Sequence, residues 1–258
     1  MTAMAHNWIG VWTLYAREVR RFVKVYAQTL VAPVVTTLLF LAVFMLAIGP
    51  DRAEIAGIPF IDFLAPGLVM MAVAQNAFAN TSSSIVIAKV QGNIVDTLMP
   101  PLTAHELTLA FAFGGATRGV AVGVLTMLAM APFVGIGIDH WGYALFHLVA
   151  ASLMLSLIGI AGGIWSEKFD HIAAVTNFVV TPLAFLSGTF YNLERLPDAF
   201  VHIALLNPFF YMIDGFRYGV IGYADVSPVL GVAVLAAANA ALWFGCWQMF
   251  RTGYKLKA

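Results

Sequence analysis

The side chains that could carry out chemistry are few in this chain, and they lie far apart in the sequence. His105 and Glu106 begin an H-E-x-x-H pattern, but no second histidine follows four residues after the first. The sequence also lacks a G-x-S-x-G nucleophile turn and a G-x-x-x-x-G-K-[ST] phosphate loop. Its one cysteine, Cys246, excludes a multi-cysteine metal cage. We therefore expect no catalytic residue, no metal site and no cofactor bound by this chain. The remaining histidines are scattered over different segments: His6, His140, His147, His171 and His202.

The polar residues of most interest lie inside long apolar runs. Arg118 lies about 12 residues into the run at 107–138, and a guanidinium at such a depth costs at least about 2.5 to 3.5 kcal/mol. Asn76 and Asn80 share one helical face in the preceding run. Because consecutive spans are antiparallel, counting residues from the shared end places Arg118 level with Asn76. We expect Arg118 to bind the 75–80 region or to face a hydrated cavity; the alternative is a longer helix that lifts Arg118 toward the interface. The asparagines serve either interhelical packing or a substrate path.

Glycines recur at four-residue spacing near Arg118. Gly115, Gly119 and Gly123 leave one helical face without side chains, and Gly159 and Gly163 form a similar notch in a later run. Such a face lets another helix approach closely. The glycines predict tight helix packing and no chemistry.

Composition explains why these elements must be membrane helices. The chain has 258 residues, with 13 basic and 13 acidic side chains, 61% hydrophobic residues and a mean hydropathy of +0.89. A water-soluble domain carries roughly 25% charged residues, and nucleic-acid binding needs clustered basic residues that a net charge of zero does not supply. We predict an all-α polytopic membrane protein with a single transmembrane domain over residues 1–258. Its six expected transmembrane helices cover residues 28–49, 63–88, 107–134, 143–165, 171–189 and 228–250.

The basic residues outside these runs predict the orientation. With both termini in the cytoplasm, the inside set outnumbers the outside set, as the positive-inside rule requires. The inside set is Arg17, Arg20, Arg21, Lys24, Lys89, Lys168, Arg251, Lys255 and Lys257, and the outside set is Arg52, Arg195 and Arg217. No cleavable signal peptide is expected, because the first apolar run is a full span. The predicted location is the plasma membrane, the inner membrane where there are two.

Three further segments are predicted outside the spans. Residues 8–26 have an aromatic apolar face and a basic face, which is typical of an amphipathic helix in the cytoplasmic headgroup layer. Such a helix either sets topology only or transmits motion from a cytoplasmic partner. Residues 89–99 predict a short cytoplasmic helix that Pro100 and Pro101 stop; an ordinary capped loop is the alternative. Residues 199–213 are apolar but too short to span, and Pro208 interrupts them, so we expect a re-entrant or interfacial segment.

Two sequence segments, together with the amphipathic lead-in, carry a family resemblance. They are QGNIVDTLMPPLTAHELTLAFAFGGATRG at residues 91–119 and LSGTFYNLERLPDAFVHIALLNPFFYMIDGFRYG at residues 186–219. In this order they resemble the permease subunit of type-2 ABC exporters, over nearly the whole chain. The resemblance implies a membrane-spanning permease that is not an enzyme itself. Two copies would form the substrate path, and two separate ATPase subunits would bind ATP and magnesium and drive export of an amphiphilic substrate. Membrane lipids are the other expected partners, and nucleic acid is not one.

The resemblance also assigns roles to individual segments. Residues 89–99 would be the coupling helix in a groove of the ATPase, and residues 190–223 would fold as short extracytoplasmic re-entrant helices. The residues implied in ATPase coupling are Lys89, Gln91, Asn93, Asp96, Met99, Arg17, Arg20 and Arg21. Those of the extracytoplasmic gate are Phe190, Tyr191, Asn207, Pro208, Asp214 and Arg217. The first and fifth spans usually form the seam between two permeases, which adds Asn177 to the polar path or packing set of Asn76, Asn80 and Arg118.

Two other classes remain as alternatives. An ATPase-independent secondary transporter or channel would use Arg118 and the asparagine face as a charge pathway. An intramembrane hydrolase or acyltransferase would need a paired nucleophile and base, and no such pair stands at helical spacing.

Overall fold

The computed structural model describes residues 7–48, 54–135 and 137–256. His6, Arg52, Lys257 and the last residue of the first expected span lie outside these residues. These residues are mostly helical. The helices are α1 (Trp8–Val23), α2 (Ala32–Ile48), α3 (Phe60–Val90), α4 (Ile94–Leu98), α5 (Ala104–Met130), α6 (Trp141–Trp165), α7 (Phe169–Val175), α8 (Thr181–Phe185), α9 (Asp198–Leu206), α10 (Pro208–Ile221) and α11 (Pro228–Thr252). Two π-helical turns, η1 (Ala27–Val31) and η2 (Thr176–Val180), and one 3₁₀ turn, η3 (Leu193–Arg195), complete the set.

Among the described residues, five helices are long and apolar enough to cross a membrane. They are Ala27–Ala47, Phe60–Val90, Ala104–Met130, Trp141–Trp165 and Pro228–Thr252. The sixth expected span, at 171–189, is the shorter apolar helix Phe169–Phe185, built from α7, η2 and α8. It ends early because the chain turns through Ser187 and Gly188, and Gly188 has a φ of +75°. The structure therefore supports a polytopic all-α membrane protein but not six full-length spans.

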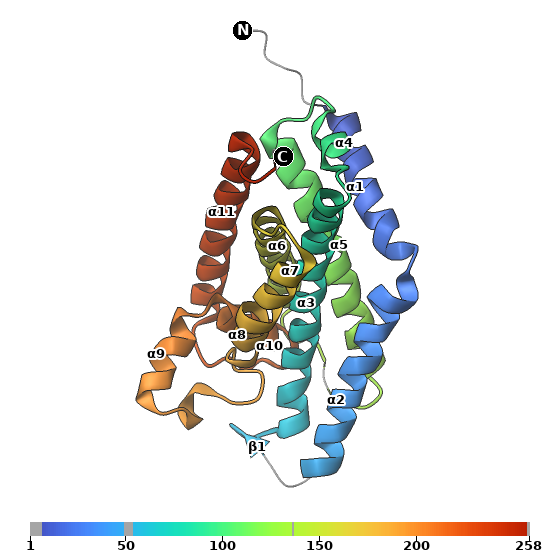
Figure 1. Cartoon of the computed structure of the whole chain (residues 1–258). Helices are drawn as coiled ribbons and strands as arrows, with labels where there is room; N and C mark the ends of the chain where they lie inside the picture. The colour runs from blue at the N-terminus through green and yellow to red at the C-terminus, as the bar shows by residue number, and fades with distance from the viewer. Residues whose placement is uncertain (1–6, 49–53, 136, 257–258) are drawn as a thin grey trace.

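The two ends of the molecule differ in what they contain. Figure 1 shows the start of α1, the end of α11 and α4 at one end, and α9 with the β-hairpin at the other. The hairpin pairs β1 (Glu54–Ile55) with β2 (Ile58–Pro59) and was not expected from the sequence. Its two-residue turn has positive φ at Ala56 (53°) and Gly57 (76°), as a tight hairpin requires.

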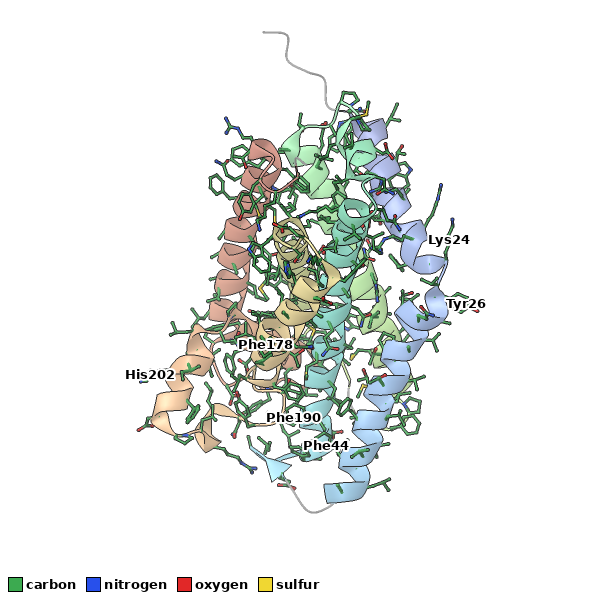
Figure 2. The ribbon with its side chains drawn as sticks, viewed as in Figure 1. Lys24, Tyr26, Phe44, Phe178, Phe190 and His202 are labelled. Atoms are coloured by element: carbon green, nitrogen blue, oxygen red, sulfur yellow. The ribbon has the colours of Figure 1, made fainter. Side chains whose placement is uncertain are left out.

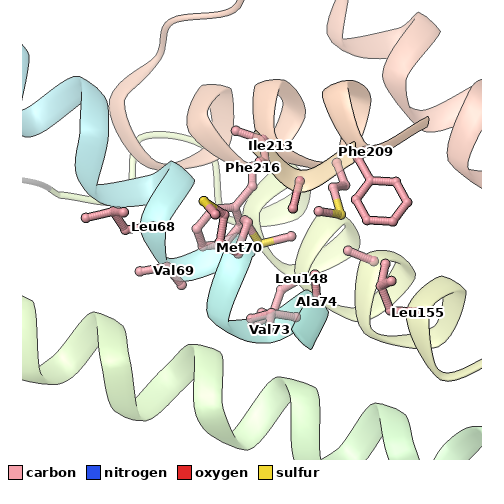
Figure 3. Packing of buried hydrophobic residues seen from close by; sticks show 14 of the residues in the cluster. Leu68, Val69, Met70, Val73, Ala74, Leu148, Leu155, Phe209, Ile213 and Phe216 are labelled. Atoms are coloured by element: carbon pink, nitrogen blue, oxygen red, sulfur yellow. The ribbon is translucent and has the colours of Figure 1, made fainter. Parts of the chain in front are cut away.

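The helix α3 forms the centre of the fold. Of its most apolar window, 83% is buried, against 11% for the first span and 17% for α11. Figure 3 shows Leu68, Val69 and Val73 of α3 packed with Leu148 of α6 and Phe216 of α10. The first span and α11 therefore lie at the periphery, where lipid or another chain can cover them.

Small residues allow α3, α5 and α6 to pack closely, as the glycine spacing predicted. A Cβ at Gly159 of α6 would lie 2.5 Å from the carbonyl oxygen of Phe78 in α3. Hydroxyl groups join the three helices there: Thr81 Oγ1 donates to Ser156 O at 2.8 Å, and Ser156 Oγ donates to Ala112 O at 2.8 Å. In lipid, such close packing and interhelical hydrogen bonds hold helices together.

Side-chain caps hold the N-terminal ends of α1 and α5 beside each other. Thr103 and Glu106 form a capping box at the start of α5, directly after the two prolines. Asn7 caps α1 by accepting from Gly10 N at 2.9 Å, and its own backbone N–H donates to Glu106 Oε1 at 2.7 Å. The start of the first helix is thus tied to the segment that follows α4.

Two helix boundaries differ from the sequence prediction. The expected helix at 89–99 is divided: Lys89 belongs to the last turn of α3, Gly92 reverses the chain at a φ of +74°, and only Ile94–Leu98 forms α4. Lys89 holds α3 in place, because its Nζ donates to Ile164 O at 2.6 Å and to Ser166 O at 2.5 Å at the end of α6. The expected helix at 8–26 ends at Val23 and is followed by a turn and η1.

The residues of α1 divide between an exposed and a buried face. Trp8 and Trp12 are exposed, and so are the basic residues Arg17, Arg20 and Lys24. Glu18 is instead buried toward α3 and α5, where polar partners surround it. The location of this helix in the headgroup layer stays a prediction.

Candidate functional site

One face of α4 is exposed and the other packs against the rest of the protein. Gln91, Asn93, Asp96 and Met99 are exposed, as the coupling assignment needs, and so is Val95. Ile94 and Thr97 are buried against the rest of the protein. Lys89 differs from the other expected coupling residues, because its ammonium group is bound to the end of α6.

Beneath α4 lies a carboxylate that sequence reasoning missed. Glu18 of α1 is fully buried and accepts a hydrogen bond from Ser84 Oγ at 2.8 Å. Arg17 Nη2 lies 3.3 Å from Glu18 Oε1, and Arg21 Nε donates to Glu18 Oε2 at 3.4 Å. Gly114 of α5 makes room, since a Cβ there would lie 2.7 Å from Glu18 Cβ. In the sequence, Glu18 is distinguished as an acidic residue within the otherwise basic segment 17–24.

The two arginines extend this cluster in opposite directions. Arg17 Nη1 donates to Thr97 Oγ1 of α4 at 3.1 Å. Arg21 Nη1 donates to Ser83 Oγ at 3.2 Å, and Arg21 Nη2 donates to Asn80 Oδ1 at 3.1 Å and to the Asn80 carbonyl. The helix α1 therefore connects α4 to the polar face of α3. Arg20, the third basic coupling candidate, is exposed.

The asparagine face continues one turn deeper to Arg118. Arg118 Nη2 donates to Asn76 Oδ1 at 2.7 Å, which confirms the contact expected from depth counting. Arg118 is only 9% exposed, and its Nε has no hydrogen-bond partner. Within the described residues no carboxylate forms an ion pair with it. Whether Asn76 and Arg118 serve a path or packing stays a prediction.

A cleft of about 420 Å³ lies on the other side of Asn76. It runs between the first span, α3 and the segment that begins at α8. Its lining residues are Gln28, Ala32, Pro33, Thr36, Thr37, Phe40, Leu68, Met71, Ala72, Gln75, Asn76, Phe185 and Phe190. The ring of Phe190 packs against those of Phe185 and Phe44, with centroid distances of 5.6 and 5.5 Å, and Figure 2 shows Phe44 and Phe190 together near the hairpin end. Asn177 is exposed on η2 and is absent from the lining.

The expected gate residues fall into separate groups. Phe190 lines the cleft, and Tyr191 beside it is half-buried. Asn207 caps α10 by accepting from Phe209 N at 3.0 Å, donates to Leu183 O at 2.9 Å, and precedes Pro208 at the break between α9 and α10. These contacts hold the break against α8.

Asp214 and Arg217 are buried and bind backbone groups, so the structure does not place them at an opening. Arg217 Nη2 donates to Gly188 O at 2.6 Å, and its guanidinium lies 3.7 Å from the centroid of the Phe63 ring. Asp214 Oδ1 accepts from Asp225 N at 2.8 Å. This pair fastens the loops at the hairpin end of the molecule.

An ion pair holds the segment after α11 at the end of the molecule where α4 lies. Lys255 Nζ lies 3.0 Å from Glu167 Oε1 in the loop between α6 and α7. The hydrogen bond from Lys255 holds the pKa of Glu167 below its ordinary value. Both groups are partly exposed, so water screens the pair and it contributes little to stability.

Comparison with known proteins identifies the family. The model of the ABC-2 type transporter family matches residues 10–221. The chain belongs to this family. It is 37% identical over 251 residues to the inner membrane transport permease YadH of Escherichia coli (strain K12), covering 97% of this chain and 98% of that protein. It is 25% identical to nodulation protein J of Bradyrhizobium diazoefficiens over 257 residues, covering 97% and 95% of the two chains.

A further relative and the membrane helices agree with the family assignment. Nodulation protein J of Rhizobium leguminosarum bv. viciae is 23% identical over 238 residues, which is 89% of this chain and 88% of that protein. The chain is therefore a multi-pass permease of an ABC transporter, with a relative named for the inner membrane. The resemblance seen in the sequence is confirmed at the level of the family.

Proposed function

We propose that this permease is the membrane half of an ATP-driven exporter in which two copies form the substrate path. A separate ATPase subunit binds ATP and magnesium and docks on α4 at the cytoplasmic end, and this chain itself catalyses nothing. Family membership supports an ATP-binding partner. The exposed Val95, Asp96 and Met99 support the outer face of α4 as the docking surface, since these side chains form no hydrogen bond or ion pair among the described residues.

The contact of Arg17 with Thr97 is the observation that carries the coupling proposal. A push on α4 reaches α1 through this hydrogen bond, and α1 is bound in turn to Asn80, Ser83 and Ser84 of α3. Since α3 is the central helix, movement of α4 is transmitted to the wall of the cleft. Closure of the ATPases would shift α4, and the two permeases would then part or rock along their seam.

The docking proposal is tested by capture of the ATPase. The full chain is purified in nanodiscs together with the soluble ABC ATPase that co-purifies with it from native membranes. Val95→Asp places a carboxylate on the exposed face of α4 and should lower ATPase capture at least tenfold. Leu206→Asp, which changes an exposed side chain at the opposite end, should leave capture unchanged.

Two results would overturn the proposal. Equal capture by Val95→Asp and the unchanged protein would remove α4 as the docking surface. Uphill transport by the purified permease alone, in vesicles without any ATPase, would favour the alternative of an ATPase-independent secondary transporter.

A further inference from the structure

The polar groups behind the cleft carry an excess of positive charge. Glu18 is paired with both Arg17 and Arg21, so one carboxylate faces two guanidinium groups. Arg118 adds a third guanidinium, with only the neutral amide of Asn76 as its side-chain partner among the described residues. A buried cation is usually matched by an anion. None of the described residues supplies one for Arg118.

The cation lies one side chain away from the cleft. Asn76 lines the cleft and at the same time accepts the hydrogen bond from Arg118 at 2.7 Å. Asn76 Nδ2 is bound to Ala72 O at 2.9 Å, so the orientation of the amide is fixed. Away from bulk water, the field of the guanidinium is weakly screened and extends into the cleft. Among the described lining residues, none has an acidic side chain that would oppose this field.

The cleft itself is polar at one end and aromatic at the other. Gln28 lies in the first turn of the first span, and Gln75 and Asn76 lie in the middle of α3. Phe40 lies further along the first span toward the hairpin, and Figure 2 shows Phe190 at that end. Gln28 and Phe40 are twelve residues apart along one helical segment, which is about 18 Å. This arrangement matches a molecule with a polar head and an apolar tail that lies along the membrane normal.

We propose that the cleft takes an amphiphile with an anionic headgroup, a phosphate or a carboxylate, whose head lies against Gln28, Gln75 and Asn76. The inference rests on the proposed function insofar as the cleft belongs to the transport path. A neutral sugar head could bond the amides but would leave Arg118 without a counter-charge. A cationic head would be repelled by it. Attraction to Arg118 therefore sets the charge preference, and the aromatic end accepts the tail.

Photolabelling tests the charge preference directly. The permease in phosphatidylcholine nanodiscs is labelled with a diazirine-bearing hexadecyl phosphate or with the matching hexadecyl glucoside, and the labelled peptides are mapped. The phosphate should label the cleft about tenfold more efficiently than the glucoside. Arg118→Gln should remove most of this preference while glucoside labelling changes less than twofold, and Arg118→Lys should retain it. Arg195→Gln, at the exposed hairpin end, is the control with no expected effect.

Variants at Gln75 keep the test decisive even if Arg118→Gln fails to fold. Gln75 is exposed in the cleft and makes no hydrogen bond among the described residues. Gln75→Glu should lower phosphate labelling, and Gln75→Lys should raise it. Equal or stronger glucoside labelling in the unchanged protein, or the same response to both Gln75 variants, would overturn the proposal.

Competition separates the possible sources of the anionic head. Phosphatidylglycerol in the nanodisc should reduce labelling if the headgroup of a whole lipid is accepted, and inorganic phosphate should reduce it only if the head alone suffices. Capture of the ATPase by the same preparations shows which proposal has failed, the substrate class or the exporter assignment. Normal capture without charge preference refutes the substrate class alone, whereas charge preference without any ATPase capture refutes the exporter assignment.

Discussion

At the scale of single residues, the decisive feature is how buried charges are compensated. Glu18 is fully buried, but two guanidinium groups and the hydroxyl of Ser84 satisfy it. Arg217 is equally buried; it donates to the carbonyl oxygens of Phe63 and Gly188, and its Nη1 lies 3.9 Å from Asp214 Oδ1. Arg118 differs from both, because the amide of Asn76 is its one side-chain partner within the described ranges. Residues of one chemical type thus have structural roles in one place and a proposed binding role in another.

Removal of the charge of Glu18 should destabilise the protein. Glu18→Gln keeps the size of the side chain but leaves Arg17 and Arg21 without a carboxylate. Because both arginines are partly exposed, we expect the free energy of unfolding to fall by about 1 to 2 kcal/mol, less than for a fully buried pair. Denaturant unfolding in detergent, followed by tryptophan fluorescence, measures the change. Glu54→Gln, at an exposed carboxylate, is the control, and equal stability of the two variants would contradict the expectation.

At the scale of elements, close approach of the central helices matters more than their apolar character. Every span is apolar, yet α3 is buried and the first span is not. The difference lies in small residues: Gly115 and Gly119 of α5 and Gly159 of α6 face side chains or backbone of neighbouring helices at contact distance. Lipid offers apolar surface as readily as another helix does, so apolar character alone cannot select neighbours.

Two glycine-to-alanine changes should separate helix packing from helix propensity. At Gly159 a Cβ would lie 2.5 Å from Phe78 O and would also overlap Thr81 Oγ1, so Gly159→Ala should cost about 1 to 3 kcal/mol. At Gly245 of α11 nothing lies within 4 Å of the added Cβ, so Gly245→Ala should be neutral or stabilising by up to about 1 kcal/mol. Thermal unfolding in detergent compares the two variants. If both lose stability equally, the close approach of α3 and α6 does not determine the cost.

At the scale of the whole molecule, the first span is the most weakly covered of the five long apolar helices found among the described residues. Only 11% of its apolar window is buried, and it forms one wall of the cleft. Val35, Leu39 and Val43 are exposed and follow each other at four-residue spacing, so they form one outward stripe. A second permease covering this stripe would close the cleft from the side.

Disulfide cross-linking in native membranes tests this contact between copies. Cys246 is buried and is replaced by serine, after which Leu39→Cys is introduced and oxidised. A linked dimer should form, because two-fold contacts bring a helix against its own copy and a disulfide needs Cα atoms within about 7 Å. Phe244→Cys on α11 has a similar exposure and should stay monomeric. Equal yields at the two positions would argue against the first span as the seam.

Much of the fold and part of the site could be predicted from the sequence. Long uncharged runs predict membrane helices because charges are costly in hydrocarbon, and Pro100, Pro101 and Pro208 mark real breaks. The contact between Arg118 and Asn76 also follows from counting residues along two antiparallel helices. These predictions depend only on length, charge and the helical rise of a single segment or of two consecutive ones.

Only the tertiary structure decided which polar groups meet across distant segments. The burial of Glu18 depends on space beside Gly114, on the hydroxyl of Ser84 and on two arginines of its own helix. Lys89 was assigned to a partner by its position, but it binds the end of α6 because that helix terminates within its reach. The physical reason is that hydropathy is a local property. The free energy of a buried charge, by contrast, depends on which helices pack around it.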